Sequence, residues 1–273
     1  MSPGKQTKFY QSFRCKEGNC IADPLELIGE EPFLIRIEDN AYSVVMRTPG
    51  DEVFHAAGFC LGEGIIDDLD DIKTIGYDRE MDANVVDVWL TPERRKKIPH
   101  LLKRTSYVSQ TSCGICGKKM IEDLNQILKP ADDGFEVELD AAFDCMNKLS
   151  KNQKYYQRTR GSHAALLFDH TLNAIAFAED VGRHNGLDKA IGKTVLNKTI
   201  CTASLLVLSS RISYELVQKA ARARIPIIIS NSRPTALAVQ MGQSLNMTLA
   251  FPGKESELII ACGRHRIKTG QSK

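Results

Sequence analysis

The sequence predicts an α/β protein whose second half is a three-layer α/β domain, preceded by a smaller α+β part. In the second half, near-continuous apolar runs alternate with amphipathic helical patterns. Such alternation indicates a largely buried sheet that helices cover on both faces. The first half instead shows short β-rich runs separated by Gly, Asn and Asp. A chain of 273 residues is long enough for two domains.

In the first half, three runs rich in β-branched and aromatic residues predict strands. They read PFLIRIED, YSVVMRT and NVVDVWLT and occupy residues 32–39, 42–48 and 84–91. Residues 51–66 predict a helix, because apolar side chains recur on one face and glycines follow them. Trp89 alternates with its strand neighbours, which favours a place in the core. Residues 1–22 are polar and irregular, which predicts a mobile arm.

The second half predicts a regular succession of elements. A helix over residues 140–151 precedes the strands HAALLFD and NAIAFAE, and another helix follows over 184–196. Next come the strand SLLVLSS, the helix SYELVQKAARAR, the strand PIIIS, the helix TALAVQMGQSLN and the strands MTLAF and ELIIA. We therefore divide the chain into an arm (1–22), a small α+β domain (23–110), a cysteine loop with the helix after it (111–133) and the α/β domain (134–273).

Composition excludes several classes of protein. The formal net charge of +2 is too small for a general nucleic-acid binder, which normally shows a strongly basic face. No apolar run approaches the roughly 20 residues needed to span a bilayer, and the N-terminus lacks the apolar core of a signal peptide. Eight cysteines are far below the density of a disulfide scaffold. We expect a cytoplasmic protein without nucleic-acid or membrane partners, with Cys60, Cys145, Cys201 and Cys262 as small buried side chains.

Three strand ends in the second half carry similar polar residues. Ligands collect where strands end and helices begin, because helix N-termini offer free N–H donors and a positive dipole end. Gly182 would allow a tight turn, and Arg183 and Arg211 could bind a phosphate through their guanidinium groups. Capping of the following helices is the alternative for Ser, Asn and Asp at these ends. The interpretation as an anionic, nucleotide-like site selects Asp180, Gly182, Arg183, His184, Asn185, Ser210, Arg211 and Ser230.

The segment TSCGICGK, residues 111–118, places two cysteines three positions apart between glycines. Cys113 and Cys116 precede a predicted helix that begins with two lysines, and both the helix dipole and the lysine charges favour a thiolate. A second thiol three residues away can relay a persulfide by exchange. We assign Cys113 as the persulfide carrier and Cys116 as its helper, an order that the sequence itself leaves open.

Three other functions of this cysteine pair compete with sulfur carriage. A four-cysteine zinc site would need a second close pair, and Cys15 with Cys20 is the one such pair, in the predicted arm. We therefore expect no structural metal. A zinc deaminase would need H-x-E or C-x-E followed by P-C-x-x-C, but Ser112 stands before Cys113. A thioredoxin-like dithiol oxidoreductase remains the alternative, although residues 105–112 are too polar for the buried strand that normally precedes its motif.

Several long strings of the sequence match the pattern of one family. They are EEPFLIRI, GFCLGEGII, TSCGICGK, GSHAA, EDVGRHNGLDKAIG and SSRISYELVQKA, spread from about Glu31 to Arg266. On these strings the chain resembles the FdhD family of formate dehydrogenase accessory sulfur carriers. The resemblance implies that a cysteine desulfurase passes sulfur to the CxxC loop. The protein would then carry this sulfur to a molybdenum bis(pterin guanine dinucleotide) cofactor, its bound cargo, which is destined for formate dehydrogenase.

The resemblance also implies a cytidine deaminase-like fold for the second half, a homodimer, and the activity of a sulfurtransferase-type carrier with a cysteine persulfide intermediate. It adds His163 of the motif GSHAA to the site. The segment associated with the guanine dinucleotide part of the cofactor corresponds to Phe251, Pro252, Gly253, Lys254, Glu255 and Ser256. This segment is one residue shorter than the family pattern. Arg160 stands where a second glycine is common, and it either extends the anion site or faces solvent.

Overall fold

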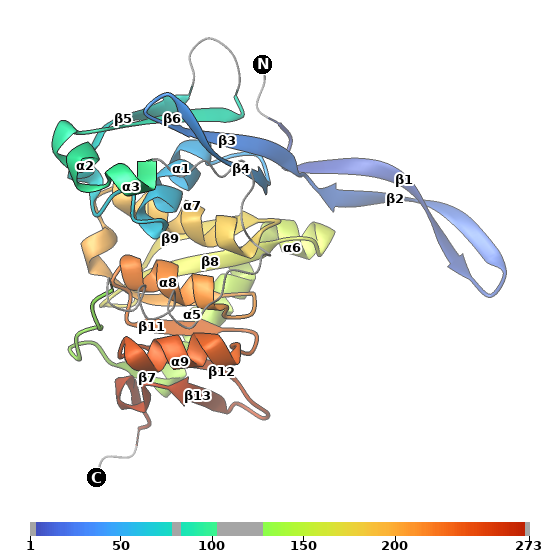
Figure 1. The fold of residues 1–273 in the computed structure, drawn as a ribbon. Coiled ribbons are helices and arrows are strands. Elements are labelled where there is room, and N and C mark those ends of the chain that lie inside the picture. The colour runs from blue at the N-terminus through green and yellow to red at the C-terminus, as the bar shows by residue number, and fades with distance from the viewer. Residues whose placement is uncertain (1–3, 78–82, 103–127, 271–273) are drawn as a thin grey trace.

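The computed structural model describes residues 4–77, 83–102 and 128–270 (Figure 1). A two-stranded ribbon projects from a body that contains a four-stranded sheet and a six-stranded sheet, with helices between the two sheets. Three predictions lie outside the described residues: Cys113, Cys116 and most of the helix expected after them. Within the described residues, no helix is both long and apolar enough to cross a membrane.

The four-stranded sheet contains the three predicted strands and one more. Its order is β4-β3-β6-β5, with β3 and β6 parallel and the outer pairs antiparallel. Alternate side chains, such as Phe33 and Ile35 on β3, are fully buried because one face of the sheet packs against α1. The elements of this half are β3 (Glu31–Ile37), β4 (Asn40–Arg47), α1 (Glu52–Gly62), η1 (Leu69–Asp71), β5 (Ile72–Tyr77), β6 (Val85–Leu90), α2 (Pro92–Lys97) and α3 (Pro99–Leu102).

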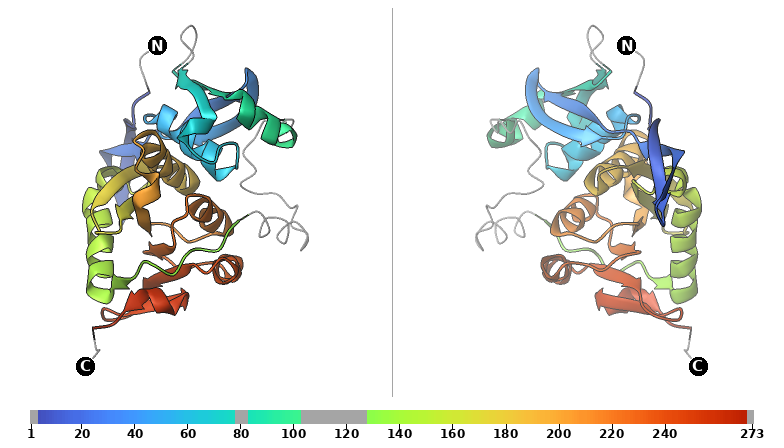
Figure 2. Two further views of the ribbon diagram at one scale, coloured as in Figure 1. Left: turned by 90° about the vertical axis from the view of Figure 1, so that its left-hand side faces the viewer. Right: turned by 90° about the vertical axis from the view of Figure 1, so that its right-hand side faces the viewer.

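The six-stranded sheet confirms the predicted succession of strands and helices in the second half. Its order is β13-β12-β11-β10-β8-β9; β10, β11 and β12 pair in parallel and the other pairs are antiparallel. Helix α5 covers one face, and α7, α8 and α9 cover the other, which completes the three layers (Figure 2). The elements are α5 (Leu139–Asn152), α6 (Lys154–Thr159), β8 (His163–Asp169), β9 (Ala174–Asp180), α7 (Arg183–Leu196), β10 (Ala203–Leu208), α8 (Tyr214–Arg222), β11 (Ile227–Ser230), α9 (Ala236–Ser244), β12 (Thr248–Pro252) and β13 (Leu258–Cys262). A short parallel pair, β7 (Val137–Glu138) and β14 (Ile267–Lys268), lies beside them.

Two glycines allow α1 of the first half to cross α7 of the second half at close range. A Cβ added to Gly58 would lie 1.8 Å from the carbonyl oxygen of Asp188, and one added to Gly192 would lie 1.7 Å from that of Phe54. Neither position can hold a side chain, so the two helix backbones touch. One cluster of buried side chains therefore runs from the four-stranded sheet into the six-stranded sheet. The domain boundaries given above stay a prediction, because the two halves share this core.

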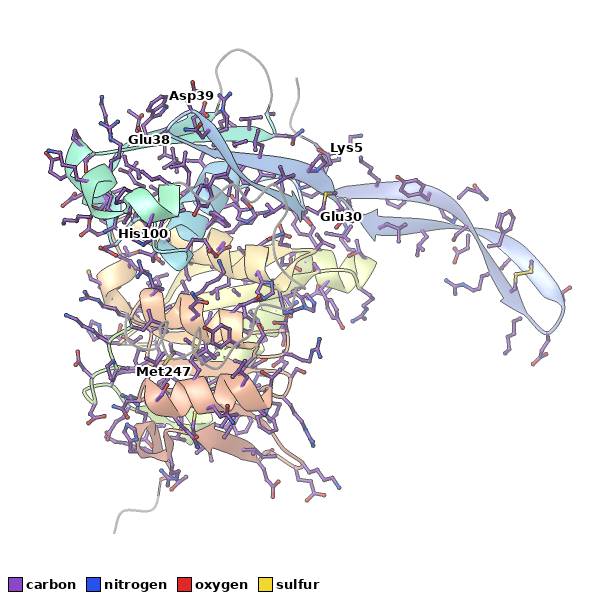
Figure 3. The ribbon with its side chains drawn as sticks, viewed as in Figure 1. Lys5, Glu30, Glu38, Asp39, His100 and Met247 are labelled. Atoms are coloured by element: carbon purple, nitrogen blue, oxygen red, sulfur yellow. A yellow bond between two sulfur atoms is a disulfide. The ribbon has the colours of Figure 1, made fainter. Side chains whose placement is uncertain are left out.

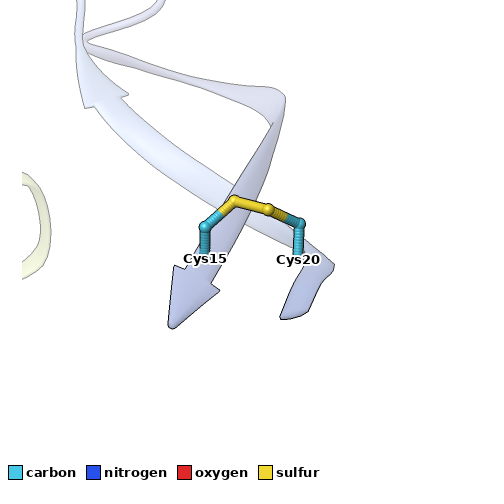
Figure 4. The surroundings of a disulfide bond; sticks show 2 residues. All are labelled: Cys15 and Cys20. Carbon is cyan, nitrogen blue, oxygen red and sulfur yellow. A yellow bond between two sulfur atoms is a disulfide. The ribbon is translucent and has the colours of Figure 1, made fainter. Parts of the chain in front are cut away.

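The N-terminal arm is more regular than its sequence suggests. Residues Thr7–Lys16 (β1) and Asn19–Ile28 (β2) form an antiparallel ribbon, where we expected an irregular segment. Glu17 and Gly18 turn the chain with positive φ values of 49° and 81°, the backbone that a two-residue hairpin turn requires. Cys15 and Cys20 face each other across the strands and form a disulfide (Figure 4). Most side chains of the ribbon are exposed among the residues that the structure describes, so no pattern of burial marks its strands in the sequence.

Two expectations about single residues are wrong. Trp89 is 39% exposed, because it lies on the face of the four-stranded sheet that points away from α1. Cys201 is exposed in the short 3-10 helix η2 (Ile200–Thr202). Cys60, Cys145 and Cys262 are buried as predicted.

Candidate anion-binding site

The predicted site residues of the second half gather along one edge of the six-stranded sheet. Strands β9, β10 and β11 end at this edge, and β8 begins there, because β8 runs antiparallel to β10. The register places His163 opposite Asp180 and Leu208 opposite Ser230. Helices α7, α8 and α9 begin at the same edge (Figure 1). Their N-terminal N–H groups and positive dipole ends therefore add to the positive potential there.

A cluster of basic side chains surrounds His163. Burial lowers the pKa of His163, and the charges of Arg183, His184 and Arg211 lower it further. These groups come from β8, the start of α7 and the loop after β10, so the fold brings together three separate parts of the sequence. Positive groups that face one another disfavour their own charged forms. A bound anion would relieve this repulsion.

Arg183 has an unused hydrogen-bond donor at the same edge. Its Nε atom is buried and has no hydrogen-bond partner within the described part of the chain. Leaving a buried donor without a partner costs about 1–3 kcal/mol, so an acceptor placed there would be stabilised. A phosphate oxygen suits a guanidinium group, because such charge-assisted hydrogen bonds are short and strong.

His184 is held by two residues at the start of α8. Its Nε2 lies 2.6 Å from Oε2 of Glu215 and 3.3 Å from Oγ of Ser213. The hydrogen bond with His184 lowers the pKa of Glu215, while partial burial opposes this effect. The carboxylate therefore stays charged and fixes the orientation of the imidazole. Ser213 and Glu215 do not stand out in the sequence, because a serine at the N-cap and a glutamate in the first turn are ordinary features of a helix start.

Asp180 and Asn185 are engaged within the fold. Asp180 is fully buried, and its carboxylate accepts a hydrogen bond from the backbone N–H of Thr48 at 3.1 Å and another from the Asn185 amide at 2.9 Å. It also forms an ion pair with Lys189 at 2.7 Å. Asn185 donates a further hydrogen bond to the carbonyl oxygen of Met46 at 2.7 Å. The two residues thus attach the start of α7 to the segment after β4.

Gly182 is required for a different reason from the tight turn that we expected. Its φ of −96° is an ordinary extended value that any residue adopts. A Cβ at this position would come within 2.7 Å of the Asn185 amide nitrogen. That amide cannot move aside, because Asp180 and Met46 hold it. Space, and not backbone conformation, selects glycine here.

Ser210 and Ser230 shape the loops at the strand ends. They are 3% and 0% exposed, and the Ser230 hydroxyl donates a hydrogen bond to the carbonyl oxygen of Ser210. Ser209, one position earlier, is less buried, and its hydroxyl accepts a hydrogen bond from the N–H of Ala164 at 2.8 Å. Arg211 is exposed at this edge. Of these residues, the arginine is the group that remains available to a ligand.

Residues 251–256 lie at the far end of the same edge. They include the end of β12 and the turn into β13, which a hydrogen bond from the N–H of Gly253 to the carbonyl oxygen of Glu257 closes at 2.7 Å. The guanidinium of Arg233, after β11, lies 5.9 Å from the ring centroid of Phe251. Three strand spacings separate β8 from β12, which is about 14 Å. The edge is therefore long enough for an extended ligand.

Arg160 is exposed and lies over the ring of Tyr156 at 5.1 Å, just before His163 in the chain. Its φ of 55° is left-handed, where the family pattern has a glycine. Within the described residues, no group of three or more His, Cys, Asp or Glu side chains could hold a metal ion. Cys15 and Cys20, the second close pair of cysteines in the sequence, form a disulfide with each other.

Comparison with known proteins agrees with this architecture. The model of the FdhD/NarQ family matches residues 28–268. The sulfur carrier protein FdhD of Streptomyces coelicolor is 33% identical over 97% of this chain and 96% of its own length. That of Mycobacterium tuberculosis is 36% identical over 84% of this chain and 87% of its own length.

A solved structure has the same fold. It is the crystal structure of a Desulfotalea psychrophila protein assigned to the formate dehydrogenase accessory proteins. It superimposes with a TM-score of 0.77 at 21% identity, and the match covers 96% of this chain and all of that one. The family match spans both sheets, the strand edge and the cysteine loop. The chain belongs to the FdhD/NarQ family.

Proposed function

We propose that this protein is a sulfur carrier that receives persulfide sulfur from a cysteine desulfurase and passes it to a molybdenum bis(pterin guanine dinucleotide) cofactor required by formate dehydrogenase. Membership of the FdhD/NarQ family supports the role of sulfur carrier. The resemblance of the motifs CGIC and EDVGRHN supports the identity of the donor and of the cargo. The family match does not favour a thioredoxin-like dithiol oxidoreductase.

The cysteine pair supplies the covalent chemistry. The Cys113 thiolate attacks the outer sulfur of the desulfurase persulfide, a new S–S bond forms at Cys113, and the desulfurase thiolate leaves. The Cys116 thiolate then attacks the inner sulfur, which releases the outer sulfur as hydrosulfide and leaves a disulfide between the two cysteines. A cellular thiol restores the pair. No further oxidant is needed, because the persulfide already carries the oxidised sulfur.

The strand edge of the second half would hold the cargo. The observation that carries this assignment is the gathering of Arg183, His184 and Arg211 around His163, together with the unpartnered Nε of Arg183. Guanine dinucleotides carry two linked phosphates, which arginine forks and helix N-termini bind well. Residues 251–256 lie along the same edge, where they could contact the guanine end.

Three finer features belong to this proposal. The protein acts as a homodimer in the cytoplasm, with the desulfurase and formate dehydrogenase as its partners. The second half follows the cytidine deaminase-like type, whose three-layer arrangement the sheet and its helices resemble. The cofactor is cargo and not a resident group, so the sulfur-carrying step itself needs only the chain's own thiols.

A nucleotide titration tests the cargo site. Calorimetry should show GDP binding to the wild-type protein, and Arg183→Ala should weaken it about ten- to a hundredfold, the loss of a charge-assisted hydrogen bond. The matched control is Arg95→Ala, because Arg95 pairs with Glu38 at 2.9 Å on the surface of the first half. Equal GDP affinity for all three proteins would refute the site. Loss of binding in both variants would indicate a general charge effect.

A further inference from the structure

The outer part of the ribbon carries the disulfide between Cys15 and Cys20 (Figure 4). The two cysteines lie opposite each other in the register of β1 and β2, and a single pair of residues separates them from the turn at Glu17 and Gly18. Both cysteines are exposed, so a thiol in solution can reach the S–S bond. They also precede residue 28, where the match to the family model begins, so that match does not account for them.

The disulfide holds together the tip of the ribbon and no other part of the chain that the structure describes. It joins residues five positions apart, which the turn already brings face to face. Neither cysteine belongs to one of the two hydrophobic cores. The stabilisation that a disulfide gives falls as the loop that it closes becomes shorter. The body of the protein should therefore keep its fold when this bond is reduced.

The base of the ribbon is held by contacts that do not involve sulfur. Arg158 of α6 forms a two-pronged ion pair with Glu26 of β2. Beyond this base most side chains of the ribbon are exposed, and they stand clear of the body (Figure 3). An isolated two-stranded ribbon is at best marginally stable in water. The pairing of the strands near the tip therefore depends on the disulfide, whereas the base does not.

The other cysteines that the structure describes are less suited to thiol–disulfide exchange. Cys60, Cys145 and Cys262 are buried. Burial raises the pKa of each of these thiols, that of Cys145 to about 11. Exchange proceeds through thiolates, so thiols that stay protonated react slowly. Cys201 is exposed but unpaired. Within the described residues, the accessible cysteine pair is therefore the one on the ribbon.

We propose that Cys15 and Cys20 form a thiol–disulfide exchange site for low-molecular-weight thiols, and that the redox state of this pair switches the ribbon tip between paired and open strands. Exposed disulfides are the labile ones, whereas structural disulfides resist reduction by glutathione. The proposal concerns the ribbon alone and does not depend on sulfur carriage.

The exchange takes place in two steps. A small thiolate attacks one sulfur of the disulfide, a mixed disulfide forms, and the other cysteine leaves as a thiolate that takes up a proton. A second small thiolate then attacks the sulfur of the bound small molecule, which frees the second cysteine and releases the small-molecule disulfide. Two electrons thus pass from two small thiols to the cysteine pair. Oxidation by the small-molecule disulfide follows the same steps in reverse.

A glutathione titration of the full-length wild type tests the exchange. The protein is equilibrated at a series of ratios of reduced to oxidised glutathione, quenched with acid, alkylated and digested. The peptide that contains both cysteines should pass from no alkyl label to two labels as reduced glutathione increases, and return to none in oxidised glutathione. In the Cys15→Ser variant, oxidised glutathione should remain attached to Cys20, because no second thiol resolves the mixed disulfide. A wild-type pair that stays unlabelled at every ratio would overturn the proposal.

Amide hydrogen exchange tests the switch in the oxidised and the reduced wild type. After reduction, the hydrogen-bonded amides of residues 11–16 and 19–23 should exchange about thirtyfold faster, the factor by which closing so short a loop favours the paired strands. The amide of Gly29, which donates to the carbonyl oxygen of Gln6 at the base, is the internal control and should not change. Cys15→Ser with Cys20→Ser should match the reduced wild type. Equal exchange at the tip in the oxidised and reduced proteins would overturn the switch. Both readouts are located on the ribbon, so such a failure is distinct from a failure of Cys113 to gain sulfur.

Discussion

The ammonium of Lys189 lies 2.7 Å from a carboxylate oxygen of Asp180, and both side chains are almost completely buried. Lys189 also donates a hydrogen bond to the carbonyl oxygen of Thr48 at 2.7 Å, and Asp180 accepts one from the N–H of Thr48 at 3.1 Å. The pair therefore joins the end of β9 and the middle of α7 to Thr48, just after β4. Arg183 and His184 lie between Asp180 and Lys189 in the chain, so the first half of the chain helps to hold the proposed site in position.

Lys189→Met should destabilise the fold by about 3–5 kcal/mol, because it leaves the Asp180 carboxylate buried without its counter-ion. Chemical denaturation followed by circular dichroism measures this loss. The control is Lys193→Met on the same helix, whose ion pair with Asp51 is also 2.7 Å long but half-exposed. Such a pair contributes at most about 1 kcal/mol. Equal losses in both variants would contradict a special role for the buried pair.

His55 should make stability depend on pH. Its ring is fully buried against Phe33, and neither ring nitrogen has a hydrogen-bond partner among the described residues. Burial, and then the charges of Lys189, Lys219 and Arg47, hold the pKa of His55 well below its ordinary value. The unfolded chain takes up a proton below about pH 6.5 and the folded chain does not. Acid therefore favours the unfolded state.

The expected slope is a loss of about 1.4 kcal/mol of unfolding free energy for each pH unit below 6.5, down to the pKa of the folded protein. Urea unfolding of the wild type and of His55→Leu at pH 7.0, 6.0 and 5.5 measures the unfolding free energy of both proteins. The difference between them isolates the contribution of His55, since the other groups titrate equally in both proteins. The difference in stability between the two proteins should shift in favour of the variant as the pH falls. A difference that stays constant with pH would show that His55 takes up its proton in the folded protein.

The sulfur-carrying loop and the cargo site should respond to mutation independently. Cys113→Ala removes the attacking thiolate, so it should abolish persulfide formation and leave GDP affinity nearly unchanged. Arg183→Ala should do the reverse, with normal sulfur loading and GDP affinity lowered about ten- to a hundredfold. Persulfide labelling measures sulfur loading, and calorimetry measures GDP affinity, on the same preparations of each variant. If either variant lost both properties, one shared site would explain the data better than two.

The sequence predicts the second half of the fold well, because burial on both faces leaves near-continuous apolar strands between amphipathic helices. It fails at the ribbon, since the exposed Phe9 and Phe13 carry no pattern of burial. The spacing of Cys15 and Cys20 around Glu17-Gly18 is the signal that could have indicated a hairpin there. The close crossing at Gly58 and Gly192 cannot be read from the sequence at all, because it depends on how α1 and α7 meet.

The sequence predicts which residues lie at the candidate site, but it predicts the roles of only some of them. Arg183, His184, Arg211 and His163 do gather at one sheet edge. Asp180 is not free to bind a ligand, because it forms a buried ion pair with Lys189, which lies about two helical turns into α7. A lysine on an amphipathic helix normally faces solvent, so the sequence offered no reason to expect it in the core. Whether a polar residue of the motif EDVGRHN is free to bind a ligand therefore depends on its pairing partner in the fold, which the motif itself does not show.

The central claim is that Cys113 carries sulfur, and the intact mass of the protein tests it most directly. Wild type incubated with a cysteine desulfurase and cysteine should gain about 32 Da, one sulfur atom, which a thiol reductant removes. Cys113→Ala should gain nothing under the same conditions, while Cys201→Ala, which removes an exposed thiol elsewhere, should load like the wild type. A wild type that stays unmodified while it reduces protein disulfides with turnover would contradict the account and identify a dithiol oxidoreductase.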